Sequence, residues 1–299
     1  MRCTRCGGEA WIELRRHNAA YCDRCFLHAF EEQVGRAIHR ERMFAPEDRV
    51  LVAVSGGKDS LALWDVLQRL GYRASGLHLD LGIEGYSAVS RRKVEAFASE
   101  RGLELIVVDY REELGGGVDS LYRKVRRNPC SACGLSKRHF FNRVALERGF
   151  DVVATGHNLD DEAASLLGNL LHWRVGYLSR QSPVMESTHP HMVRKVKPLF
   201  RLTERETAAY AILRGIDYVV DECPLSEGAR SLLYKEILNR LEAESPGAKH
   251  SFLFGYLERG RSAFREAGET VHLRECELCG QPTTEPLCAF CRMKQLLHP

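Results

Sequence analysis

The sequence contains no long hydrophobic run. No part of its 299 residues forms an uninterrupted apolar stretch of the ~20 residues that a membrane-spanning helix needs. The first residues, Met1 to Cys6, contain no apolar core of a secretion signal. Hydrophobic residues make up 44% and charged residues 28% of the chain, which is ordinary for a soluble globular protein. We therefore expect a cytoplasmic protein without a membrane partner.

The sequence also lacks a large net charge. Its formal charge is only +3, so nucleic-acid binding has to be argued from local clusters rather than from the total. Two clusters are present: Arg36, Arg40 and Arg42 on one face of a predicted helix, and a cationic run at 123–127 before Cys130. Each cluster has two interpretations, a contact with RNA phosphates or a charged surface that is simply solvated.

All eleven cysteines of the sequence belong to one of three groups. Paired CxxC motifs in a chain without a secretion signal indicate metal binding more often than disulfides or free structural thiols. The spacers, 15 residues in the N-terminal group and 8 in the C-terminal group, favour closed tetrahedral Zn²⁺ sites that staple small modules. The two predicted zinc sites are Cys3, Cys6, Cys22 and Cys25, and Cys276, Cys279, Cys288 and Cys291.

A glycine turn, Ser55-Gly56-Gly57-Lys58-Asp59-Ser60, follows an apolar run at 50–54 and precedes residues with helical spacing. Two glycines let the backbone approach a ligand, and the first N–H groups of the helix favour anionic oxygens. The turn is too short for a Walker A loop and lacks G-x-G-x-x-G. It resembles the PP-loop, S-G-G-x-D-S, of the ATP pyrophosphatases, which cleave ATP between its α and β phosphates. A glycine turn without a ligand is the alternative.

Strands and helices alternate through the middle of the chain. This order predicts an α/β fold, a parallel sheet with right-handed crossovers, helices on both faces and a ligand site at the carboxyl ends of the strands. The predicted strands lie at 50–54, 74–79, 104–108, 151–155 and 216–220, with a loop at 173–191 and an extended segment at 193–199. We expect three domains: a zinc ribbon at 1–27, an α/β domain at 28–270 with a linker helix (28–45) and C-terminal helices (228–268), and a second ribbon at 271–299.

Cys130, Cys133 and Cys223 can all reach the predicted strand-end crevice. An enzyme that makes amides from ammonia has no use for three thiols there, whereas sulfur transfer uses them in a persulfide or as ligands of an iron–sulfur cluster. Three thiolates on a four-iron cube leave one iron open for hydrosulfide, while a third zinc site lacks a fourth ligand. We predict a [4Fe-4S] cluster. A catalytic cysteine pair without metal and structural thiols are the alternatives.

The order of motifs along essentially the whole chain resembles the TtuA group of tRNA 2-thiolation enzymes, in the TtcA/TtuA family of PP-loop ATP pyrophosphatases. The motifs are the N-terminal CxxC pairs, S-G-G-K-D-S, P-C-S-A-C-G, T-G-H-N-L-D-D-E-A, D-E-C-P and the C-terminal CxxC pairs. The TtcA branch lacks the paired ribbons and modifies a cytidine, so it is the poorer match.

The resemblance implies a reaction. ATP adenylates the C2 oxygen of a tRNA uridine, the 5-methyluridine at position 54 of the T-loop, and sulfide from the cluster replaces that oxygen while AMP leaves. The sulfur comes from the C-terminal thiocarboxylate of a small ubiquitin-like carrier. We also expect Mg²⁺ and consider a homodimer.

The resemblance further assigns roles to residues. Lys58 neutralises phosphate charge, and Asp59 holds Mg²⁺ or positions the nucleotide. Lys137 and Asp161 are candidates for charge stabilisation and proton transfer, against a surface lysine and a helix-capping aspartate. At the strand end, His78 is better interpreted as a packed, hydrogen-bonded histidine. The predicted nucleotide contacts are Ala53, Val54, Ser55, Gly56, Gly57, Lys58, Asp59, Ser60, Leu79, Lys137, Gly156 and Asp161.

Two other functions stay open from the sequence. Thiolation of the wobble uridine, at tRNA position 34, would use the same chemistry on another base. A non-catalytic, zinc-dependent RNA-binding protein with a vestigial PP-loop belongs to another class, and the intact Lys58, Asp59 and Ser60 speak against it.

Overall fold

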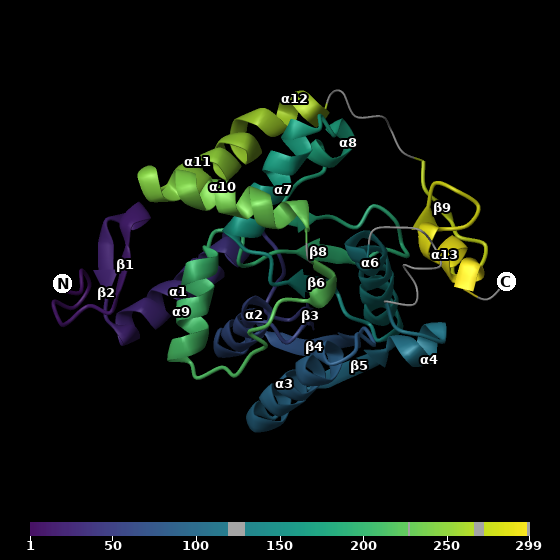
Figure 1. Cartoon of the computed structure of the whole chain (residues 1–299), viewed down its shortest axis with the longest axis horizontal. Helices are drawn as coiled ribbons and strands as arrows, with labels where there is room; N and C mark the ends of the chain where they lie inside the picture. Colours follow the sequence, from purple (N-terminus) through teal and green to yellow (C-terminus); the bar gives the residue numbers. More distant parts are fainter. Residues whose placement is uncertain (119–128, 227, 266–271, 298–299) are drawn as a thin grey trace.

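The computed structural model describes residues 1–118, 129–226, 228–265 and 272–297. The cationic run predicted at 123–127 therefore lies outside the described residues. Figure 1 shows a central sheet surrounded by helices, with the N-terminal hairpin at one end of the molecule and the C-terminal module at the other. None of the helices within these described ranges is both long and apolar enough to cross a membrane.

The central sheet is the feature that positions everything else. Its strands follow the spatial order β5-β4-β3-β6-β8-β7, and all neighbouring pairs are parallel except the pair β7 and β8. This arrangement confirms the predicted α/β fold with a mostly parallel sheet. The strand bounds, in chain order, are β3 Arg49–Ala53, β4 Arg73–Asp80, β5 Leu105–Asp109, β6 Val152–Thr155, β7 Val184–Met185 and β8 Arg194–Val196.

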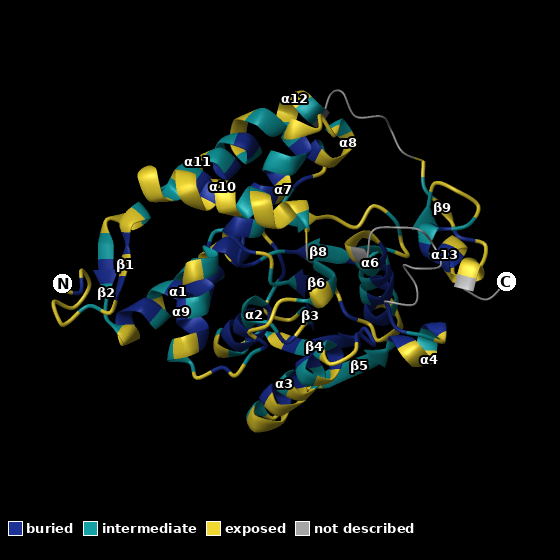
Figure 2. Ribbon diagram, in the orientation of Figure 1, coloured by how far each residue is buried: buried dark blue, intermediate teal, exposed yellow. Residues whose placement is uncertain are grey.

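Alternate residues of β3 enter two different hydrophobic clusters, because successive side chains of a strand point to opposite faces. Val50 and Val52 pack into a cluster with side chains of the helices α1, α2, α3, α7 and α9. Leu51 packs into a second cluster with side chains of α4 and α6. Both faces of the strand are therefore buried, as Figure 2 shows for the centre of the molecule, and this burial explains the continuous apolar run at 50–54.

The helices cover the sheet on both faces and extend beyond it on one side. On one face, α1 and α2 both contact α9; beyond this layer, α10 and α11 both pack on α7. The helix bounds are α1 Asp23–Arg40, α2 Lys58–Arg69, α3 Tyr86–Arg101, α4 Tyr110–Leu114, α6 Pro129–Glu147, α7 Leu159–Leu171, α8 Val175–Leu178, α9 Glu204–Leu213, α10 Arg230–Glu244, α11 Ala248–Gly255 and α12 Arg261–Arg265.

Three expectations about secondary structure are wrong. The segment 216–220 is not a strand, because the N–H of Val219 donates to the carbonyl of Gly56 at 2.9 Å and so binds the glycine turn instead of a sheet edge. The fifth parallel strand is β8, and the segment predicted as a loop at 173–191 contains α8 and the edge strand β7. Finally, the linker helix begins at Asp23 rather than 28 and ends at Arg40 rather than 45.

Two small modules flank the sheet. The N-terminal module contains the hairpin of β1 (Ile12–Leu14) and β2 (Ala19–Tyr21), and the C-terminal module contains β9 (Arg274–Glu275), β10 (Pro282–Thr283) and α13 (Ala289–Leu297). The C-terminal module docks on α6, where the rings of His139 and Phe290 stack with centroids 3.7 Å apart.

Candidate functional site

The glycine turn lies between β3 and α2, at the carboxyl edge of the sheet. Gly57 is the N-cap of α2, so the free N–H groups of the first helical turn open beside the turn. Gly56 has a φ of +83°, and a Cβ there would lie 2.9 Å from the Ser90 hydroxyl. Ser90 in turn donates to the carbonyl of Ser55 at 2.5 Å. Conformation and packing both require glycine at this position.

The two serines of the turn hold its shape. The N–H of Ser55 donates to the Ser60 hydroxyl at 3.1 Å, and that hydroxyl donates to the carbonyl of Gly57 at 2.9 Å. Ser60 is 6% exposed. Ser60 therefore acts on a ligand mainly by shaping the loop, and the surface that a phosphate can reach is formed by the Ser55 hydroxyl and by backbone N–H groups.

Asp59 is oriented by two other elements. Its Oδ1 accepts from the Asn158 side-chain amide at 3.1 Å and from the Thr207 hydroxyl, and its Oδ2 lies 3.1 Å from Lys58 Nζ. Asn158 is the N-cap of α7, and Thr207 lies on α9. The carboxylate is thus fixed from both sides, which suits a group that holds a cation or positions a nucleotide.

A chain of alternating charges continues from Lys58. Lys58 Nζ lies 2.7 Å from Glu204, whose second oxygen accepts from Lys235 at 3.1 Å. Lys235 also pairs with Asp161 at 2.6 Å. Burial opposes the charged form of Lys58, but Asp59 and Glu204 outweigh it and raise the pKa of Lys58. Burial likewise disfavours the Glu204 carboxylate, but Lys58 and Lys235 lower its pKa overall. Lys58 and Glu204 therefore stabilise one another in their charged forms.

Gly156 packs directly against the turn. A Cβ at this position would lie 2.9 Å from the carbonyl carbon and oxygen of Asp59 and from the nitrogen of Ser60. These are backbone atoms, so the loop itself would have to move. The structure therefore places the second loop, after β6, in contact with the first, after β3.

Gly156→Ala is expected to raise the KM for ATP by about 10-fold or more, because overpacking of this kind costs about 1–3 kcal/mol and acts directly on the loop. ATP binding, measured by calorimetry or by initial rates, checks this. The matched control is Gly255→Ala, since a Cβ at Gly255 meets no other atom within 4 Å. An unchanged KM in Gly156→Ala would show that the loop yields without loss.

A cavity of about 280 Å³ opens beside the turn. Its lining includes residues predicted for the nucleoside and all three central cysteines together with Lys137. The structure thus brings together residues that lie far apart in the chain: Ala53, Val54, Ser55, Leu79, Cys130, Cys133, Lys137 and Cys223.

The three central cysteines belong to two elements. Cys130 and Cys133 lie at the start of α6, three residues apart, and Cys223 lies just before the short 3₁₀ helix Pro224–Ser226. Burial, with help from the other two thiols, raises the pKa of Cys130. Unlike the terminal quartets, the trio forms no group with sulfur atoms within 4.8 Å of one another among the described residues. Three soft donors around a cavity fit a multi-iron cluster better than a single closed ion.

The terminal cysteines form two compact quartets, and within each the sulfur atoms all lie within 4.8 Å of one another. The sulfur atoms of Cys6 and Cys22 are 3.7 Å apart, and those of Cys279 and Cys288 are 3.8 Å apart. Four thiolates at ~2.3 Å from a tetrahedral ion lie about 3.8 Å from one another. The donor sets and their spacing therefore fit closed zinc sites.

Two other predicted residues, His78 and Asp161, lie at different places in the structure. His78 is buried, and its Nδ1 lies 2.9 Å from the carbonyl oxygen of Val54, as a packed histidine should. Asp161 does not line the cysteine cavity; it caps the N–H of Asn158 at 3.1 Å and pairs with Lys235. Sequence reasoning missed Glu204 and Lys235 as partners of the turn. The capping box of Thr203 and Glu206 marks the start of α9 beside Glu204, but nothing local indicates that Glu204 pairs with Lys58.

This fold and site define the class of PP-loop, ATP-using enzymes. The family model described as "PP-loop domain" matches residues 27–241, and the one described as "2-thiouridine synthetase TtuA, N-terminal LIM domain" matches residues 2–27. The chain belongs to the TtuA-type tRNA 2-sulfurtransferases within that class.

Similar proteins extend over nearly the whole chain. A tRNA-5-methyluridine(54) 2-sulfurtransferase of Thermus thermophilus is 57% identical over 98% of this chain and 91% of its own. The protein of the same name from Pyrococcus horikoshii is 42% identical over 98% of this chain and 93% of its own. Among solved structures, the U34-tRNA thiolase NcsA from Methanococcus maripaludis with its [4Fe-4S] cluster is 28% identical, with a TM-score of 0.83, and covers 99% of this chain and 96% of its own.

Proposed function

We propose that this chain is an ATP-dependent tRNA thiolase that replaces the C2 oxygen of the 5-methyluridine at position 54 with sulfur. The observation that carries the proposal is the convergence of Cys130, Cys133 and Cys223 on the cavity beside the PP-loop. The choice of base is supported by the relatives at 57% and 42% identity, which are named for position 54.

In this proposal the uridine C2 oxygen attacks the α phosphorus of ATP, the bond to the β phosphate breaks, and diphosphate leaves. Ser55 and the N–H groups at the start of α2 bind the phosphates, Lys58 neutralises their charge, and Asp59 holds Mg²⁺ or positions the nucleotide. Gly56, Gly57 and Ser60 complete the phosphate loop, and Ala53, Leu79 and Gly156 line the nucleoside. Val54, Lys137 and Asp161 are further proposed nucleotide contacts.

The second step exchanges oxygen for sulfur. Sulfide bonds to C2 of the adenylated base, the C2–O bond breaks, and AMP leaves with the oxygen and the electron pair of that bond. When bound, a [4Fe-4S] cluster held by the three central cysteines would supply an iron without a protein ligand, which can hold hydrosulfide. Lys137 lies beside these cysteines and is the candidate for charge stabilisation, and Asp161, held by Lys235, stays the candidate for proton transfer.

The proposal also includes the bound metals, the partner proteins and the cellular location. Zn²⁺ occupies both terminal cysteine quartets, in ribbons at 1–27 and 271–299 around an α/β domain at 28–270. Sulfur arrives from a ubiquitin-like carrier with a C-terminal thiocarboxylate, and the enzyme acts in the cytoplasm, as relatives named "Cytoplasmic tRNA 2-thiolation protein 1" do by name. A homodimer stays a prediction.

The test uses the protein purified without oxygen, tRNA that contains 5-methyluridine, ATP, Mg²⁺ and a sulfide source. The expected product, by mass spectrometry of nuclease fragments, is tRNA with one oxygen exchanged for sulfur at position 54. Exchange at position 34 would instead support wobble-uridine thiolation, which the NcsA structure favours by its name. Failure to release diphosphate with any tRNA would support the non-catalytic RNA-binding protein.

A further inference from the structure

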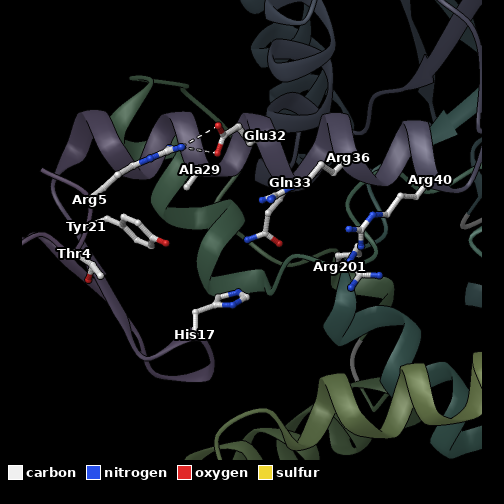
Figure 3. A pocket seen from close by; sticks show the side chains of 10 residues that line it. All are labelled: Thr4, Arg5, His17, Tyr21, Ala29, Glu32, Gln33, Arg36, Arg40 and Arg201. Atoms are coloured by element: carbon white, nitrogen blue, oxygen red, sulfur yellow. Dashed lines mark hydrogen bonds and ion pairs between the residues drawn. The ribbon is translucent and has the colours of Figure 1, made fainter.

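A second cavity, of about 600 Å³, lies at the N-terminal end of the molecule. It is bordered by the N-terminal module, by α1 and by Arg201, which precedes α9. Figure 3 shows the ten side chains that line it: Thr4, Arg5, His17, Tyr21, Ala29, Glu32, Gln33, Arg36, Arg40 and Arg201. None of these residues belongs to the PP-loop or the cysteine cavity.

The lining is strongly cationic. Of the ten residues drawn in Figure 3, four are arginines and one, Glu32, is a carboxylate. Arg5 neutralises that carboxylate, with its Nη2 at 2.9 Å from both oxygens. In the part of the chain that the structure describes, Arg36, Arg40 and Arg201 form no ion pair with a carboxylate. The cavity therefore carries three arginines outside any ion pair among the described residues, and the carboxylates Glu41 and Glu258 act on Arg201 only as longer-range charges.

Arg201 is held in place by its surroundings. Its guanidinium lies over the ring of Phe254, 4.2 Å from the centroid, and Arg16 donates to its carbonyl at 3.1 Å. Burial, together with the positive charge of Arg40, lowers the pKa of Arg201. Figure 3 shows the side chains of Arg40 and Arg201 at the same end of the cavity. Holding like charges together destabilises the free protein, and a bound anion would relieve this repulsion.

The chain connects this cavity to the catalytic edge. Arg201 lies three residues before Glu204, which binds Lys58 of the PP-loop at 2.7 Å. Arg36 and Arg40 lie one helical turn apart on α1, so they are neighbours on its surface. An extended polyanion that reaches the catalytic edge could thus contact this cavity at more than one point.

We propose that this cavity binds phosphodiester groups of the tRNA backbone through Arg36, Arg40 and Arg201. The inference rests on the proposed function, which supplies the polyanion. Guanidinium groups suit phosphate because they bind two of its oxygens at once. Gln33 and Tyr21 add neutral hydrogen-bonding groups to the same lining. The site positions the tRNA and does not take part in the reaction.

The test is tRNA binding by the double variant Arg36→Gln/Arg40→Gln at several salt concentrations, with the full metal-loaded protein. Both side chains are exposed, so the fold should be retained. We expect Kd for tRNA to rise about 10-fold and the slope of log K against log salt to fall by about 1–2. The KM for tRNA should rise in parallel, while kcat at saturating tRNA is unchanged.

The matched control is Arg240→Gln, whose side chain is 79% exposed and pairs with Glu236 on α10. A second variant, Arg201→Lys, keeps the charge but loses the two-point contact and should weaken binding less than the double variant. Unchanged tRNA affinity and salt slope in the double variant would overturn the inference, as would an equal loss of tRNA affinity in Arg240→Gln. It would also be overturned if the double variant lost affinity for a protein partner but kept its affinity for tRNA. Thiolation by the unmodified enzyme, measured in parallel, reports separately on the proposed function.

Discussion

Cys223→Ser is expected to lower the rate of tRNA thiolation by about 10³-fold or more. Cys223 shares one cavity with Cys130 and Cys133, and the hard oxygen of serine replaces a soft thiolate that iron–sulfur clusters require. The anaerobically purified variant should also lose its brown colour and most of its iron. ATP should still bind, because the PP-loop is built from other residues.

Ser131→Ala is the matched control for this variant. Ser131 lies between Cys130 and Cys133 on the same turn of α6, and it is exposed. Its replacement should leave iron content and activity unchanged. Thiolation activity of the unmodified protein after strict iron removal would contradict a role for the cluster. A mechanism that uses a cysteine pair without metal would then explain the chemistry better.

Lys58→Met is expected to lower kcat/KM for ATP by about 10²–10³-fold, the usual effect of removing one group that stabilises developing charge. Lys58 lies between Asp59 at 3.1 Å and Glu204 at 2.7 Å. Without the ammonium group, two carboxylates face the phosphate site and repel the nucleotide. Diphosphate release at several ATP concentrations measures the effect.

Lys93→Gln is the control for loss of one positive charge, since Lys93 pairs with an exposed Asp217 on the surface. Its kcat/KM for ATP should match that of the unmodified protein. Equal rates for Lys58→Met and Lys93→Gln would show that Lys58 only stabilises the fold around the loop.

The charge chain also explains how the loop is held before ATP binds. Lys58, Glu204, Lys235 and Asp161 connect the starts of α2, α9 and α7 with α10 through consecutive ion pairs. Each member has partners of opposite charge, so the cost of partial burial is offset.

Local sequence was sufficient for the elements whose chemistry is local. Continuous apolar runs predicted the bounds of β3, β4, β5 and β6 to within a residue or two, because strands buried on both faces require such runs. The glycine turn was recognisable because its conformation needs glycine, as the φ of Gly56 shows. The CxxC spacings predicted two quartets, and the structure gathers the same eight sulfur atoms.

Other features depend on contacts between distant segments, for which a local pattern gives no signal. The segment 216–220 has the composition of a strand, yet Val219 binds Gly56 because β8 already pairs with the free edge of β6. Glu204 and Lys235 meet Lys58 and Asp161 only when α9 and α10 pack beside the turn.

The sequence by itself thus determined the class of site: a phosphate-binding turn, two cysteine quartets and three further thiols, each encoded within a few adjacent residues. Only the tertiary structure decided which of them share a cavity, because the parallel sheet brings together the ends of strands that lie far apart in the sequence. That packing places Lys137 with the cysteines, moves Asp161 to the charge chain of Lys58, and brings Arg36 and Arg40 of α1 beside Arg201.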